Sequence, residues 1–119
     1  MDISNKALNI IREKIKELGN KELFDSTGVY ESPIYDDTIE IQLMKDYVEY
    51  SEDDYFCTAY ADIHYNTKNN KITIGKNGDY DVYDDDKLNS IPLLNFCYEN
   101  KDKIKAIIKE ALECGNEKK

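Results

Sequence analysis

The chain has 119 residues, of which 40% are hydrophobic and 34% charged, with a net charge of −9. This length suits one domain with a single core, and the ten tyrosines argue against disorder. The charge disfavours contact with nucleic acid or an anionic membrane and favours contact with basic protein surfaces. The N-terminal residues have no secretory signal, and no stretch reaches the ~18 apolar residues that a membrane span needs.

Three cysteines, Cys57, Cys97 and Cys114, are an odd number at unrelated spacings. Such spacing fits neither a disulfide framework nor a zinc site, and it favours a reducing compartment. We therefore expect a cytoplasmic protein of a bacterial cell, of a kind that a phage can also encode.

Residues 4–18 are predicted to form an amphipathic helix. Ser4 is the expected N-cap, and Gly19 is expected to adopt a left-handed conformation after the last turn. The apolar stripe consists of Leu8, Ile11, Ile15 and Leu18.

Turn residues such as Gly28 and Pro33 predict a short edge strand and a loop before residue 38, and from Thr38 the hydrophobic period of two predicts further strands. A short edge strand is expected near 27–31, long strands over 38–50 and 55–66, and shorter ones around 72–74 and after the Asn77-Gly78 turn. Pairing Tyr47 with Ala59 places Leu43 opposite Ile63, with the apolar residues of both long strands, Cys57 among them, on one inner face.

Residues 90–114 are predicted to form a second helix that begins at Ser90, with an expected break or kink near Glu99-Asn100. Residues 116–119 are expected to fray. The predicted fold is a single α+β domain over residues 1–119. It consists of an N-terminal helix, an antiparallel meander sheet of four to five strands and a C-terminal helix, with both helices packed on one face of the sheet.

The acidic residues concentrate in the predicted strands and their loops. Residues 25–66 contain eleven carboxylates and one base, and residues 79–86 add five aspartates. We expect the outer face of the central hairpin to be exposed and to combine carboxylates with tyrosines, which suits a surface rich in Lys or Arg. The alternative is a solvated acidic face whose tyrosines simply suit strands. The predicted partner-binding residues are Asp46, Tyr50, Asp53, Asp54, Tyr60, Asp62, Asp84, Asp85 and Asp86.

No motif for catalysis, metal binding or a cofactor is present. His64 and Asp62 share a strand face as a general base and its orienting carboxylate would, but no nucleophile accompanies them, so a surface histidine is the simpler interpretation. The runs of aspartate lack the spacing of an EF-hand loop. Lys68, Lys71 and Lys76 form a basic edge that is too small for nucleic-acid binding.

In its size, its acidity and its lack of motifs, the chain is similar to the small acidic inhibitors of phages and mobile elements, including anti-CRISPR and anti-restriction proteins. The resemblance implies a non-enzymatic inhibitor that blocks a basic nucleic-acid-binding surface of a nuclease or effector complex by charge mimicry. Three alternatives remain open: an immunity protein for a basic nuclease toxin, a housekeeping interaction module, and a carboxylate-based, divalent-metal-dependent enzyme or metal-binding domain.

Overall fold

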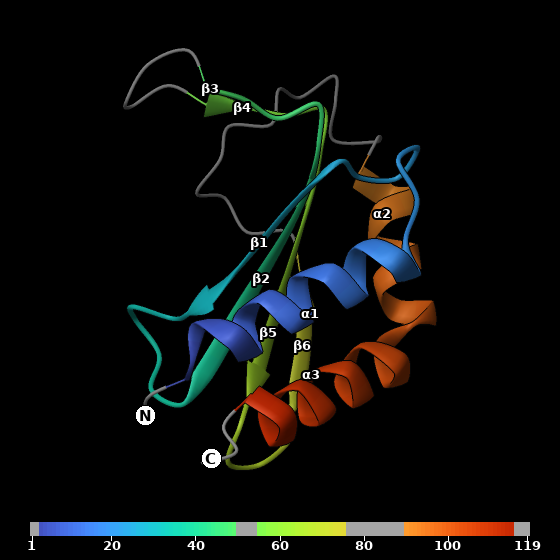
Figure 1. Ribbon diagram of the computed structural model, residues 1–119. Helices are drawn as coiled ribbons and strands as arrows, with labels where there is room; N and C mark the ends of the chain where they lie inside the picture. The colour runs from blue at the N-terminus through green and yellow to red at the C-terminus, as the bar shows by residue number, and fades with distance from the viewer. Residues whose placement is uncertain (1–2, 50–54, 76–89, 116–119) are drawn as a thin grey trace.

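The computed structural model describes residues 3–49, 55–75 and 90–115. Its elements are α1 (Asn5–Leu18), β1 (Ser26–Glu31), β2 (Thr38–Lys45), β3 (Val48–Glu49), β4 (Tyr55–Phe56), β5 (Ala59–Asn66), β6 (Ile72–Gly75), α2 (Ser90–Glu99) and α3 (Lys101–Gly115). Four strands form an antiparallel meander in the order β1-β2-β5-β6, and β3 pairs with β4 beyond one end of that sheet (Figure 1). The predicted α+β class, with an N-terminal helix, a meander and C-terminal helices packed against the sheet, is confirmed.

The core lies between the helices and one face of the sheet. Alternate residues of β2 and β5, such as Ile41 and Ile63, are fully buried on this face. Ile11 and Ile15 of α1 and Ile108 of α3 belong to the same cluster. Burying each of these side chains stabilises the fold by roughly 1.5–3 kcal/mol, so the apolar stripes of the helices hold them against the sheet.

Helix α1 begins at the predicted cap and ends differently from the prediction. The Oγ atom of Ser4 accepts a hydrogen bond of 3.1 Å from the N–H of Ala7 and donates one of 2.9 Å to the carbonyl of Gly115. The expected left-handed conformation of Gly19 is wrong, because its φ is −91°. A side chain is excluded there for another reason, since a Cβ atom on Gly19 would collide with the ring of Phe24.

The predicted break in the C-terminal helical region is confirmed at Asn100, between α2 and α3. The side-chain amide of Asn100 donates a hydrogen bond of 2.9 Å to the carbonyl of Phe96. The backbone carbonyl of Asn100 accepts a hydrogen bond of 2.8 Å from the backbone N–H of Ile104 in α3. Asn100 thus links both helices, and α3 runs back antiparallel to α1 across the sheet (Figure 1).

The central hairpin pairs in a register two residues away from the predicted one. Ile63 lies opposite Ile41, and Leu43 lies opposite Ala61. A shift of two residues keeps every side chain on its predicted face, so the hydrophobic pattern alone cannot distinguish the two registers. The prediction of two unbroken long strands is also wrong, because the first is interrupted at Asp46 and Tyr47 and the second at Cys57 and Thr58.

Cys57 does not lie in the inner core as predicted. It falls between β4 and β5, where the strand alternation stops, and it is fully buried in a second cluster with Met44 and Tyr60. Tyr47 packs against this cluster. The predicted Asn77-Gly78 turn and the fraying of residues 116–119 lie outside the described residues.

Candidate functional site on the second sheet face

The sheet face opposite the main core was expected to be open, and this expectation is wrong for the residues of β2 and β5. Tyr60 is 0% exposed and Asp62 is 5% exposed, so neither presents its side chain at the surface. Glu40, Gln42 and Met44 on the same face are also buried. Strand alternation predicts which residues share a face but carries no information on whether that face is covered.

Among the predicted partner-binding residues, only Asp46 is both described and exposed. Tyr60 and Asp62 come from neighbouring positions of β5 on the buried second face. The remaining predicted partner-binding residues lie outside the described residues: Tyr50, Asp53, Asp54, Asp84, Asp85 and Asp86.

Asp46 lies just beyond β2 in a left-handed backbone conformation with a φ of 55°. Its N–H donates to both carboxylate oxygens of Asp25, at 3.1 and 3.2 Å. Its own Oδ2 atom accepts a hydrogen bond of 3.0 Å from the hydroxyl of Thr58. Short polar side chains tolerate this conformation because they form such local hydrogen bonds. Asp46 therefore holds together three segments at this end of the sheet.

His64 on β5 lies between two carboxylates. Its Nε2 atom is 3.1 Å from Oε1 of Glu40 and 3.3 Å from Oδ2 of Asp62. The side chain of His64 is 23% exposed, and those of Glu40 and Asp62 are 11% and 7% exposed. Carboxylates only accept hydrogen bonds, so the Nε2 atom must carry the hydrogen. The arrangement holds the imidazole firmly in place.

The sequence argument found Asp62 beside His64 and missed Glu40. Glu40 is the direct cross-strand partner of His64 in β2, and a correct hairpin register would have identified it. Tyr35 was also missed. It lies in the loop after β1, with its ring centroid 5.9 Å from that of His64 at an interplanar angle of 52°. No sequence pattern connects a loop tyrosine with a strand 29 residues away.

A hollow of about 450 Å³ opens beside His64. It lies where the second face meets the loop after β1 and the turn between β5 and β6. Its lining residues are Ile34, Tyr35, Asp36, Thr38, His64, Asn66, Asn69, Lys71 and Thr73. Most of these side chains are polar, and Ile34 and Tyr35 are the exposed apolar groups.

The thiol of Cys97 shows no sign of activation. Burial raises the pKa of Cys97 to about 12, which keeps this thiol protonated at neutral pH. Cys57 is buried and Cys114 is exposed, and no disulfide joins any of the three described cysteines. Among residues 3–49, 55–75 and 90–115, no group of three or more His, Cys, Asp or Glu side chains is placed to hold a metal ion.

The fold and its second face define an acidic α+β protein with a clamped histidine at the edge of a polar hollow. None of the described helices combines the length and the apolar character needed to cross a membrane. No protein-family model matches the chain, no curated protein matches its sequence, and no solved structure matches its fold.

Proposed function

We propose that this protein is a small, acidic, non-enzymatic binding protein. It would inhibit a nuclease or another nucleic-acid-binding effector by occupying the basic surface on which that effector binds nucleic acid. Its carboxylates would take the place of phosphate groups, and its partner would supply Lys and Arg side chains.

One observation carries the proposal, namely the uneven distribution of charge over the chain. The three helices together carry eight bases and six acids. The segments 50–54 and 76–89 carry eight acids and two bases, a net charge of −6. The described residues as a whole carry fifteen acids and twelve bases, a net charge of only −3. The negative charge is therefore concentrated in two connecting segments and does not follow from a uniformly acidic surface.

The described residues that flank these two segments support a common binding surface. Strands β3 and β4, which flank residues 50–54, extend from the end of the sheet at Lys45 and Ala59 (Figure 1). Ser90, which follows residues 76–89, accepts a hydrogen bond of 3.1 Å from the N–H of Tyr60 near the same end. The exposed Asp46 also lies at this end. A basic partner that docks at this end would meet Asp46 and the described residues that flank both acidic segments.

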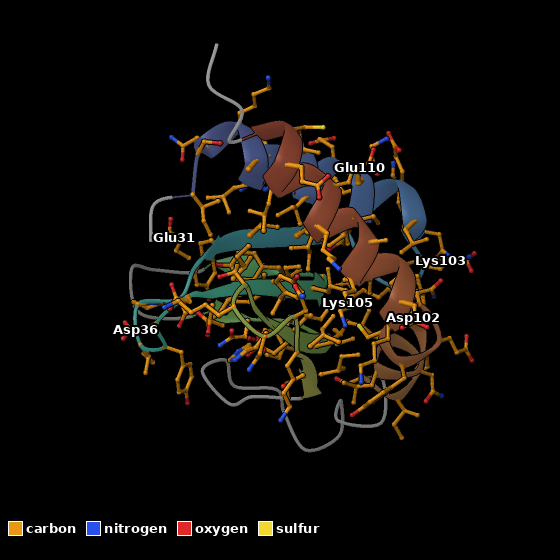
Figure 2. The ribbon with its side chains drawn as sticks, turned by 90° about the horizontal axis from the view of Figure 1, so that it is seen from below. Glu31, Asp36, Asp102, Lys103, Lys105 and Glu110 are labelled. Carbon is orange, nitrogen blue, oxygen red and sulfur yellow. The ribbon has the colours of Figure 1, made fainter. Side chains whose placement is uncertain are left out.

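The test uses two variants with the same change in net charge. In the first, Asp53 and Asp54 are replaced by Lys. In the control, Glu110 and Glu113, which are both exposed on α3, are replaced by Lys. Figure 2 labels Glu110 on this helix. Each protein is used to capture partners from a host lysate at low and high salt. The captured protein is then assayed for binding and cleavage of nucleic acid with and without the inhibitor.

We expect the native protein and the α3 control to suppress nucleic-acid binding by the captured partner, and the Asp53 and Asp54 variant to lose this effect. Raising the salt concentration should weaken capture steeply, because close charge pairs between exposed groups are screened. Equal inhibition by both variants, or capture that is insensitive to salt, would contradict the proposal.

A further inference from the structure

The hollow beside His64 lies at the end of the second sheet face where Thr38 pairs with Asn66, away from the end where Lys45 pairs with Ala59. Loop residues Ile34 and Tyr35 form one side, and they are 73% and 56% exposed. The turn between β5 and β6 forms the opposite side and contributes Asn66, Asn69 and Lys71. The hydrogen bonds of this turn determine which polar atoms remain available to a ligand.

The turn uses the carboxamide oxygens of both asparagines. Oδ1 of Asn66 accepts hydrogen bonds of 2.9 and 3.1 Å from the N–H groups of Lys68 and Asn69. Oδ1 of Asn69 accepts one of 2.9 Å from the N–H of Lys71. Because backbone N–H groups need acceptors, these contacts also determine which end of each carboxamide is oxygen.

The nitrogen ends of the two carboxamides are therefore left as donors at the hollow. Over the described residues, neither Nδ2 of Asn66, Nδ2 of Asn69 nor the ammonium group of Lys71 has a hydrogen-bond or ion-pair partner. The hydroxyl of Thr38 already donates to the carbonyl of Asp36 at 3.0 Å. The turn side of the hollow is thus rich in donors and carries one positive charge.

The opposite side of the hollow has a different character. Tyr35 and Ile34 offer an aromatic ring and an aliphatic side chain that are only partly withdrawn from water. The carboxylate of Asp36 belongs to the same loop, which lies at the edge of the molecule (Figure 2). This carboxylate would keep an anionic group away from the loop and direct it toward Lys71.

We propose that the hollow binds a small ligand that carries an anionic oxygen group, a carboxylate or a phosphate, next to an aromatic or apolar group. The oxygen atoms accept charge-assisted hydrogen bonds from Lys71 and the carboxamides of Asn66 and Asn69. The apolar group covers Tyr35 and Ile34 and removes them from water. This site is separate from the proposed function, since it would take an anion whereas the acidic segments would take a basic protein.

The proposal can be tested by NMR titration of the intact protein with phenyl phosphate, benzoate, inorganic phosphate and benzylamine. The reporters are the side-chain N–H₂ signals of Asn66 and Asn69 and the imidazole signals of His64, which is the only histidine of the chain. We expect saturable shifts in the millimolar range with phenyl phosphate or benzoate. Benzylamine, which carries the opposite charge, should produce no saturable shift of these signals.

Two substitutions separate the parts of the site. Lys71→Gln should weaken phenyl phosphate binding about fivefold, because it removes a charge-assisted donor. Lys68→Gln is the matched control. It has the same charge change in the same turn, but Lys68 is 77% exposed, lies 3.4 Å from Asp37 and does not line the hollow. Tyr35→Ala should weaken phenyl phosphate and leave inorganic phosphate unchanged.

The comparison of phenyl phosphate with benzoate identifies the anionic group that the site prefers. Binding of phenyl phosphate in preference to benzoate would assign a phosphate, and the reverse would assign a carboxylate. The absence of a saturable shift with both anions, equal losses in the two lysine variants, or equal shifts with benzylamine would each overturn the proposal.

Discussion

The Nε2 atom of His64 lies 3.1 Å from a carboxylate oxygen of Glu40, its direct partner across β2 and β5. The same nitrogen lies 3.3 Å from Asp62, so one imidazole separates two carboxylates that are largely withdrawn from solvent. Removing the imidazole takes a hydrogen-bonding group away from two carboxylates of low exposure. We therefore use substitution of His64 to test how this contact contributes to stability.

We therefore expect His64→Ala to lower the free energy of unfolding by ~1–3 kcal/mol. Urea unfolding monitored by circular dichroism measures this loss. The variant with both His64→Ala and Glu40→Gln should recover part of it, because the second substitution removes one of the two negative charges. A loss that is unchanged in the double variant would show that His64 acts by packing alone.

The contact between Gly19 and Phe24 predicts a second effect on stability. A Cβ atom at Gly19 would overlap the Phe24 ring, so Gly19→Ala should cost ~1–3 kcal/mol through displacement of a core aromatic. Gly75→Ala is the control, since a Cβ atom there would meet no atom of the described residues within 4 Å. Thermal unfolding of the two variants should show a lower Tm for Gly19→Ala only. Equal values would contradict the predicted collision.

Asp46 predicts an order of stability among three variants. Its φ of 55° is costly for most side chains and free of cost for glycine. Asp46→Ala loses the side-chain hydrogen bond from Thr58 and the tolerance of this conformation, so it should cost ~1–2 kcal/mol. Asp46→Asn and Asp46→Gly should each cost less than Asp46→Ala. Denaturant midpoints measure the order, and an alanine variant as stable as the asparagine variant would contradict it.

The buried thiol of Cys97 predicts a dependence on alkaline pH. Burial raises its pKa from the ordinary value of 9.0 to about 12. Above pH 9 the unfolded chain loses this proton and the folded protein keeps it, so stability should fall by up to ~1.4 kcal/mol per pH unit. The free energy of unfolding, measured as a function of pH for the native protein and for Cys97→Ala, reveals this contribution, which should be missing in the variant. A parallel decline of both curves above pH 9 would contradict the prediction.

Thiol labelling offers an independent check on the same residue. In the folded protein at pH 8, the exposed Cys114 should react with a disulfide reagent, and the buried Cys57 and Cys97 should react only after unfolding. Rapid labelling of all three thiols without denaturant would show that the two clusters around Cys57 and Cys97 open readily.

The amino-acid sequence by itself determined the helical regions, the strands of the main sheet and most of the inner core. Hydrophobic periodicity allows one buried face on the helix with Ile11 and Ile15, and one on the strands with Ile41 and Ile63. These are the faces that are buried in the structure. The location of the charge excess was also visible at that level, because counting acids and bases requires no coordinates.

Only the tertiary structure decided the register of the central hairpin and whether its second face is buried. A pattern of period two is unchanged by a shift of two residues, so it could not reveal that Glu40 lies opposite His64. It could not show that Tyr60 and Asp62 are buried either, because alternation describes one strand and burial depends on what packs against the sheet. The hollow between Tyr35 and Lys71 likewise arises from two loops that meet only in the folded chain, where the turn's own hydrogen bonds orient its donors.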